Sequence, residues 1–153
     1  MNRRRLLLPA ICLLAALVLA AMFWSRPARI YRVERAATAQ LGKPYVFGTA
    51  GPDTFDCSGL MKYAYDRVNV SLAHNTRMVA SDESYRTISE PSDLRRGDLI
   101  FFNTVSRSGE IDHVGLWLGR GRFVHASSAS GEVMISEFDP LWQNRFVLAK
   151  RIL

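Results

Sequence analysis

The sequence contains little cysteine and little histidine. It has two cysteines, Cys12 and Cys57, and three histidines among 153 residues. Cys12 lies in a hydrophobic N-terminal run, so Cys57 is the single thiol of the remaining chain and has no partner there for an intramolecular disulfide. One cysteine and a few histidines also make a poor zinc-binding set. The composition therefore argues against a disulfide-bonded scaffold and against a zinc site.

The chain has only a small excess of positive charge beyond its first five residues. The formal net charge is +6, and Arg3, Arg4 and Arg5 supply three of these charges. The +3 that remains is too little to predict nucleic-acid binding. The chain has no internal repeat and no low-complexity segment, and its length suits one domain with a hydrophobic core.

Long hydrophobic runs are absent except at the N-terminus. Three arginines precede an uncharged, mostly apolar run over residues 6–24, and no small-residue cleavage site closes it. Its 19 residues approach the roughly 20 that span a bilayer. Residues 1–25 are therefore expected to form an export signal or, as the preferred alternative, an uncleaved membrane anchor with its arginines in the cytoplasm. Residues 26–29 are expected to be a linker, and residues 30–153 the exported domain.

The order of helical and strand patterns predicts an α+β domain. Three segments have apolar residues at helical spacing: 30–41, 57–69 and, more weakly, 75–82. Five short β-rich runs follow: 98–102, 113–118, 122–127, 133–138 and 146–152. Two segments are expected to be loops: 45–54 and 85–96. Helices followed by strands with short turns are typical of an antiparallel sheet.

Cys57 is predicted to lie in the first turn of a helix that Asp56 caps. Unpaired backbone N–H groups and the helix dipole favour a thiolate there, so we expect the thiol pKa to be lowered. The backbone N–H groups of Cys57 and Ser58 could also hold an oxyanion. Gly59 would let another segment pack closely. From its position alone, a buried and inert cysteine explains Cys57 equally well.

His113 and His125 lie on two successive predicted strands joined by a short loop. If the loop closes a hairpin with Leu118 opposite Arg122, the two histidines share one face, one diagonal step apart. A register shift of one residue would place them on opposite faces. Because a cysteine nucleophile needs a base, and the base needs a group to orient it, these histidines and Cys57 form a candidate catalytic set.

Phe55-Asp56-Cys57-Ser58-Gly59-Leu60 resembles the nucleophile motif of the NlpC family of papain-like cell-wall cysteine peptidases. Four more stretches resemble motifs of this family, in the family's order, from about Ile30 to the end of the chain. They are Gly42-Lys43-Pro44-Tyr45-Val46-Phe47-Gly48, Arg96-Gly97-Asp98-Leu99-Ile100-Phe101-Phe102, Asp112-His113-Val114-Gly115-Leu116 and Phe123-Val124-His125-Ala126-Ser127.

The resemblance implies a papain-like fold, with N-terminal helices packed on a five- to six-stranded antiparallel sheet. It implies that Cys57 is the nucleophile, His113 the general base and His125 the residue that orients His113. No metal or cofactor would be required.

Three further residues would support the site: Tyr45, Asp56 and Ser58. Tyr45 takes the place of a family tyrosine that assists the nucleophile or the substrate, although a half-buried loop tyrosine is an alternative. Asp56 is also explained as a simple helix cap. Gly97-Asp98 is expected only to shape a turn.

The resemblance implies a peptidoglycan hydrolase, a cysteine endopeptidase that cuts stem peptides at the γ-D-glutamyl–diamino acid bond through an acyl-enzyme. Its partner would be peptidoglycan stem peptides. The N-terminal run adds the membrane as a partner, with residues 6–24 as anchor and the domain at the periplasmic face of the inner membrane. A related thiol amidase or acyltransferase with another substrate is an alternative, and a non-catalytic peptidoglycan-binding module is another.

Two stretches depart from the family pattern. The chain has Phe47-Gly48-Thr49 where many members have a tryptophan and two glycines, and Leu72-Ala73-His74-Asn75 where they often have Leu-Pro-Arg-Thr. These positions border the substrate groove in the family, so they affect substrate detail rather than chemistry. His74 is expected to be a groove or surface residue outside the catalytic set.

Overall fold

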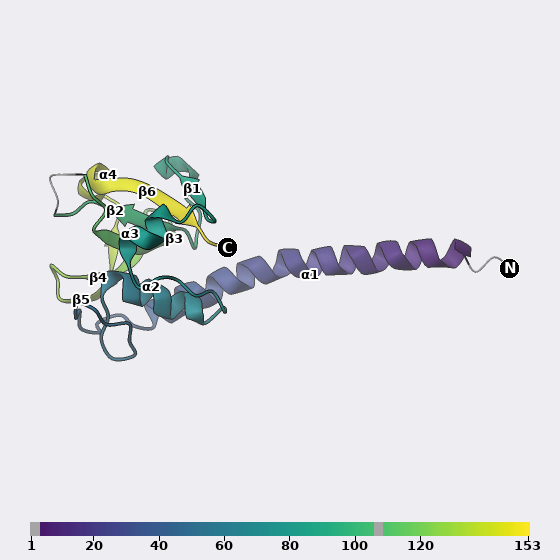
Figure 1. The fold of residues 1–153 in the computed structure, drawn as a ribbon, viewed down its shortest axis with the longest axis horizontal. Coiled ribbons are helices and arrows are strands. Elements are labelled where there is room, and N and C mark those ends of the chain that lie inside the picture. Colours follow the sequence, from purple (N-terminus) through teal and green to yellow (C-terminus); the bar gives the residue numbers. More distant parts are fainter. Residues whose placement is uncertain (1–3, 106–108) are drawn as a thin grey trace.

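The structure is a computed structural model that describes residues 4–105 and 109–153. Its helices precede most of its strands, as predicted for an α+β domain (Figure 1). In chain order the elements are α1 (Arg4–Thr38), α2 (Cys57–Asp66), α3 (Thr76–Ser81), β1 (Arg86–Ile88), a 3-10 turn η1 (Pro91–Asp93), β2 (Leu99–Phe102), β3 (His113–Gly119), β4 (Arg122–Ser127), β5 (Glu132–Glu137), α4 (Pro140–Arg145) and β6 (Phe146–Arg151).

Helix α1 continues through residues 26–29, where a linker was predicted. Pro27 lacks a backbone N–H and so removes one hydrogen bond from the helix, but the helix continues through it. The guanidinium of Arg29 donates a hydrogen bond to the Val68 carbonyl at 3.2 Å, which fastens this part of α1 to the body. The expected linker is therefore helical, while the division into an N-terminal segment and a domain stays a prediction.

The predicted membrane anchor, residues 6–24, falls on the N-terminal part of α1, which extends away from the body in Figure 1. Most side chains of this run lie outside the described residues. Among the residues that the structure does describe, no helix combines the length and the hydrophobicity needed to cross a membrane. The C-terminal part of α1 packs on the body through Val33 and Ala37, both fully buried.

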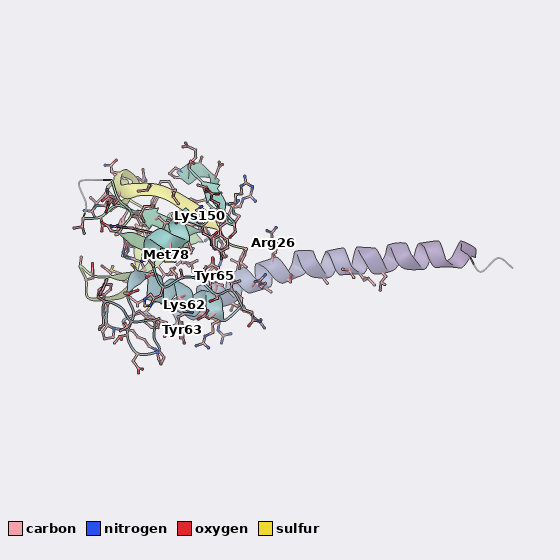
Figure 2. All side chains as sticks on the ribbon, in the orientation of Figure 1. Arg26, Lys62, Tyr63, Tyr65, Met78 and Lys150 are labelled. Carbon is pink, nitrogen blue, oxygen red and sulfur yellow. The ribbon has the colours of Figure 1, made fainter. Side chains whose placement is uncertain are left out.

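Helix α2 begins at Cys57, as predicted, because the Asp56 side chain accepts a hydrogen bond from the Gly59 N–H at 2.6 Å. It ends at Asp66, earlier than predicted. Tyr65 on its buried face is labelled in Figure 2. The Tyr65 hydroxyl donates to the Gly97 carbonyl at 2.5 Å and so joins α2 to the turn before β2.

The six strands form one antiparallel sheet in the order β1-β6-β2-β3-β4-β5. Between β3 and β4, Leu116 pairs with Val124 and Trp117 with Phe123, which is the predicted hairpin register. A bulge after Trp117 alters only the turn. Six strands agree with the predicted five to six, although β1 lies in a segment predicted as loop.

Alternate residues of the strands face two separate cores. One face packs against α1, α2 and α3 through Leu99, Phe101, Val114, Leu116, Val124 and Ala126. The other face carries Ile88, Ile100, Phe102, Trp117, Phe123 and Ala149, with Trp142 of α4 packed against them. Helix α4 was not predicted, and it gives this second face its cover.

Asp98 does more than shape the turn before β2. Its side chain is 1% exposed and accepts hydrogen bonds from the Arg151 guanidinium at 2.8 and 2.7 Å and from the Arg95 N–H at 2.8 Å. A turn residue on the surface would lack such a partner. The prediction that Gly97-Asp98 only shapes a turn is therefore wrong, because Asp98 holds the end of β6 against the start of β2.

Candidate active site

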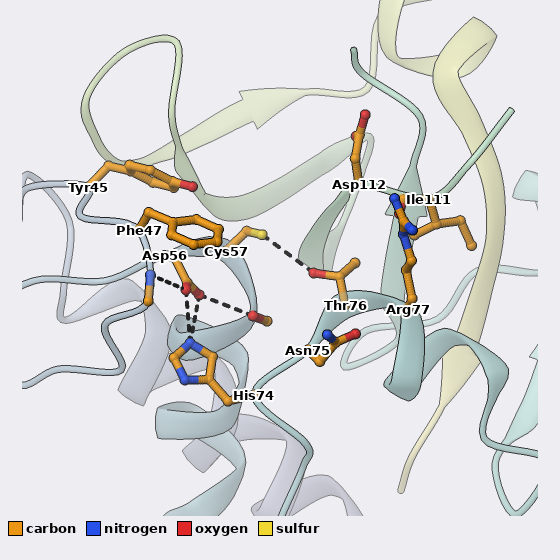
Figure 3. Close-up of a pocket in the computed structure, with 12 residues that line it drawn as sticks. Tyr45, Phe47, Asp56, Cys57, His74, Asn75, Thr76, Arg77, Ile111 and Asp112 are labelled. Atoms are coloured by element: carbon orange, nitrogen blue, oxygen red, sulfur yellow. Dashed lines mark hydrogen bonds and ion pairs between the residues drawn. The ribbon is translucent and has the colours of Figure 1, made fainter. Parts of the chain in front are cut away.

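A groove of about 440 Å³ opens at the N-terminal end of α2 (Figure 3). It is lined by Tyr45, Phe47, Gly48, Asp56, Cys57, Ser58, His74, Asn75, Thr76, Arg77, Ile111 and Asp112. Four of the six residues predicted for the site, Tyr45 and Asp56 to Ser58, thus share one groove.

Cys57 lies at the base of this groove with 9% of its surface exposed. Its Sγ is 3.5 Å from the Thr76 hydroxyl oxygen. Burial raises the pKa of the Cys57 thiol, and the Asp56 charge adds to the rise, while hydrogen bonds from Thr76 and from the backbone of Val114 and Ser58 act against it. The expected lowering of this pKa is therefore wrong, since burial outweighs the first turn of the helix. At neutral pH the thiol is protonated and needs a base.

Gly59 brings the N-terminal turn of α2 against the loop of residues 45–50. A Cβ at Gly59 would lie 2.0 Å from the Thr49 carbonyl oxygen, closer than real Cβ atoms approach backbone. In the same contact the Asp56 N–H donates to the Thr49 carbonyl at 2.8 Å. The close packing expected at this glycine is confirmed.

His113 and His125 share one face of the sheet, as the hairpin register predicted. The His113 Nε2 and the His125 Nδ1 are 2.8 Å apart, and the His125 Nε2 is 2.9 Å from the Ser136 hydroxyl. If the His113 Nε2 donates, His125 accepts at Nδ1 and donates from Nε2 to Ser136. This leaves the His113 Nδ1 with a lone pair, which is the state that a general base requires.

Both imidazoles are kept neutral by burial. Burial lowers the pKa of His113 to about 4, with the Asp112 charge acting in the opposite direction. Burial, together with repulsion from a charged His113, lowers the pKa of His125 to about 3. The Trp142 ring lies 5.9 Å from the His113 ring and 5.2 Å from the His125 ring, between centroids. The unpredicted helix α4 thus helps to exclude water from the pair.

The free energy of unfolding should fall as the pH drops from about 6.5 toward 4. His113 and His125 would take up protons near their ordinary pKa of 6.5 when unfolded, but only near 4 and 3 when folded. The unfolded chain therefore binds more protons in this window, and stability rises with pH through it. Denaturant titrations at pH 7, 6 and 5 should show a smaller loss for His125→Gln than for wild type. Parallel losses in both proteins would contradict burial of neutral imidazoles.

The groove and the histidine pair meet at the start of β3. Asp112 lines the groove, and the backbone of Val114 lies close enough to the Cys57 sulfur to act on the thiol pKa, so the two sequence neighbours of His113 both belong to the site. The His113 ring itself is buried and is not among the described side chains that line the groove. A Cβ at Gly115 would meet the Phe123 ring at 2.7 Å, so this glycine permits the close approach of β4.

The profile of the NlpC/P60 family matches residues 42–151 of the chain. The chain belongs to the NlpC/P60 family. The match covers all five motifs from which the resemblance was inferred, and the predicted family is confirmed.

Relatives within the family are similar over most of this chain. The probable endopeptidase YafL of Escherichia coli (strain K12) is 43% identical over 127 residues, which cover 81% of this chain and 49% of YafL. The murein DD-endopeptidase MepH of the same organism is 38% identical over 117 residues, 74% of this chain and 42% of MepH. The chain therefore spans about half the length of these two relatives.

A solved structure supports the same fold. The peptidoglycan hydrolase RipB of Mycobacterium tuberculosis superposes with a TM-score of 0.71 at 28% identity, over 83% of this chain and 66% of the RipB chain. The α+β fold of the NlpC/P60 family, with its antiparallel sheet, is thereby confirmed.

Three contacts of this NlpC/P60 site were not predicted. Thr76 contacts Cys57, Ser136 contacts His125, and His74 contacts Asp56 with its Nε2 3.0 and 2.9 Å from the two carboxylate oxygens. Strand alternation could have indicated the contact of Ser136. His125 pairs with Met134, and Ser136, two residues further along β5, lies on the same face of the sheet. The other two contacts join α2 and its cap to the first residue of α3 and to the loop before α3, and no local pattern indicated them.

Tyr45 stands on the groove wall opposite α3 in Figure 3. Burial raises the pKa of its hydroxyl, and the negative charges of Asp56 and of Cys57, once that thiol ionises, raise it further. Tyr45 therefore keeps its proton and offers a hydrogen-bond donor. Phe47, on the same loop, is 87% exposed and presents an apolar ring at the groove.

Proposed function

We propose that this NlpC/P60 chain is a peptidoglycan endopeptidase that cuts stem peptides through an acyl-enzyme on Cys57. The observation that carries the proposal is a groove that holds the Cys57 thiol and reaches the start of β3, where His113 follows Asp112 and pairs with His125 of β4. The names of YafL and MepH, both endopeptidases, and of the peptidoglycan hydrolase RipB support the same activity.

In the proposed reaction, His113 removes the proton from the Cys57 thiol and the thiolate attacks the amide carbonyl. The backbone N–H groups of Cys57 and Ser58, at the first turn of α2, hold the oxyanion. His113 then gives its proton to the departing amine, which leaves a thioester on Cys57. Water loses a proton to His113 and attacks the thioester, which releases a carboxylic acid and restores the thiol.

The other predicted residues have narrower proposed roles. His125 orients His113, and Ser136 in turn fixes the tautomer of His125. Ser58 acts through its backbone N–H, because its hydroxyl is 3.1 Å from the Asp56 carboxylate and is engaged there. Tyr45 donates from the groove wall to a polar group of the stem peptide.

The bond that we propose is the one between the γ-D-glutamyl residue and the diamino acid of a single stem peptide. A second candidate is the DD cross-link between two stem peptides, which the name of MepH favours. The two bonds differ in a useful way. A cut at the first splits uncross-linked muropeptides, whereas a cut at the second only converts cross-linked dimers into monomers.

Mass spectrometry of muropeptides incubated with the full chain tests the activity and the bond together. Uncross-linked monomers and cross-linked dimers should be supplied separately. We expect the monomers to split at the γ-D-glutamyl bond. Dimers that fall apart into intact monomers would instead establish the DD cross-link as the substrate. If a folded protein leaves both substrates unchanged, the peptidoglycan proposal fails, and a different amide or a binding role takes its place.

We also propose that the domain works outside the cytoplasm, at the periplasmic face of the inner membrane, with residues 6–24 as an anchor. The support is the sequence of three arginines followed by an uncharged apolar run, together with relatives whose names place their substrate in the cell wall. Fractionation of cells that express the full chain should leave it in the membrane pellet after a carbonate wash. Recovery in the soluble fraction would contradict anchoring.

A further inference from the structure

Both oxygens of the Asp56 carboxylate accept hydrogen bonds, and the two oxygens face different segments. Oδ1 accepts from the Gly59 N–H at 2.6 Å and from the Ser58 hydroxyl at 3.1 Å, both on α2. Oδ2 accepts from the Gly48 N–H at 2.8 Å, on the loop of residues 45–50. One carboxylate, only 5% exposed, therefore joins the nucleophile helix to the opposite wall of the groove.

His74 reaches this carboxylate from a third segment, the loop before α3. Its Nε2 lies 3.0 Å from Oδ1 and 2.9 Å from Oδ2 of Asp56, as the dashed lines in Figure 3 show. Because a carboxylate oxygen only accepts, the Nε2 carries the proton and donates. Of the described groups that bond to Asp56, His74 is the one that touches both oxygens.

We propose that His74 is a positioning residue of the groove. By donating to both oxygens of Asp56, it holds the 45–50 loop against the N-terminal turn of α2 and so fixes the wall that meets the stem peptide. This role rests on the proposed function, in which the groove binds a stem peptide.

The effect of His74 should fall on substrate binding more than on the chemical step. The loop that it braces carries Tyr45 and Phe47, which line the groove. The Cys57 Sγ has a contact of its own that does not involve Asp56, with the Thr76 hydroxyl oxygen at 3.5 Å. The loop has no slack against α2, since the Thr49 carbonyl already fills the space of a Gly59 side chain. A small loosening of Asp56 therefore displaces the wall while the nucleophile keeps its contacts.

Two variants of similar size separate the donor from the bulk of the side chain. His74→Gln keeps an N–H near the place of Nε2, whereas His74→Leu fills the space without a donor. We expect His74→Leu to raise KM about fivefold to tenfold with kcat within about twofold, since a hydrogen bond to a charged group is lost. His74→Gln should stay within about twofold of wild type in both constants. Lys62→Gln, which changes a partly exposed side chain of α2 outside the groove, is the matched control.

Amide hydrogen exchange on the full chain tests the same bracing without any substrate. The Gly48 N–H, which donates to Asp56, should exchange faster in His74→Leu and at the wild-type rate in His74→Gln. Unchanged KM and unchanged exchange in His74→Leu would overturn the proposal, and so would a His74→Gln variant as impaired as His74→Leu. If wild type cuts no muropeptide, the proposed function fails, but the exchange rates still decide whether His74 holds the loop.

Discussion

Replacing Cys57 by alanine is expected to lower kcat on muropeptides by at least about 10³-fold, to the background of the assay. The proposed acyl-enzyme forms on the Cys57 sulfur, and no other described thiol is available to replace it. The Thr76 hydroxyl, 3.5 Å from the Cys57 Sγ, would remain close to the vacated position, but an un-ionised hydroxyl is a weak nucleophile. The loss should appear in kcat and kcat/KM together, because the missing bond is made only after the substrate has bound.

The fold should survive this substitution. Cys57 occupies the first position of α2, where alanine is a good helix former, and the cap from Asp56 to the Gly59 N–H does not involve the sulfur. We expect the free energy of unfolding to change by about 1 kcal/mol. Cys12→Ala, which removes the chain's other thiol, should cleave at the wild-type rate. A Cys57→Ala protein that still cuts stem peptides would exclude the acyl-enzyme.

The parts of the site that sequence could predict are those that depend on local periodicity. The spacing of His113 and His125 across a short turn determined their common face, because side chains alternate along strands and the turn fixes the register. The positions of Asp56 as the helix cap and of Cys57 as the first helical residue followed from the residue preferences at helix starts. These inferences needed only neighbours in the sequence, and the structure agrees with them.

The elements that were missed had weak or overlooked local signals. Strand β1 has three residues, two of them exposed, and its register comes from pairing with β6 at the other end of the chain. Helix α4 did carry a start signal, since Asp139 accepts from the Trp142 N–H at 3.0 Å and Pro140 stands at the first position. Because the segment is short and lies between two strands, a turn was expected there. The packing of Trp142 against the histidine pair was therefore not predicted.

The direction of the Cys57 pKa could not be predicted because two effects of opposite sign compete there. The helix start is visible in the sequence, and it favours a thiolate. Burial is a property of the packed molecule, and it prevails. The contacts of His74 with Asp56 and of Arg151 with Asp98 could not be predicted for a similar reason. The partners are 18 and 53 residues apart in the sequence and meet only in the folded chain.

Asp98→Ala is expected to destabilise the domain by about 3–5 kcal/mol, the largest effect on folding that we predict. The Arg151 side chain is 14% exposed, and loss of Asp98 would leave its guanidinium almost buried without a countercharge. The turn that Asp98 closes also receives the Tyr65 hydroxyl at the Gly97 carbonyl. Damage at this point would therefore reach α2 as well as β6. Thermal and denaturant unfolding should both show the loss.

A double variant distinguishes an unpaired charge from a lost turn. Asp98→Ala with Arg151→Met removes both charges, and we expect it to recover at least half of the lost stability, because a buried pair contributes less than the penalty for breaking it. Asp66→Ala, which breaks the exposed pair of Asp66 with Lys62, should change stability by only about 0.5 kcal/mol or less. If the double variant is as unstable as Asp98→Ala alone, the hydrogen bond that the Asp98 carboxylate accepts from the Arg95 backbone N–H is what holds the turn, and the ion pair is secondary.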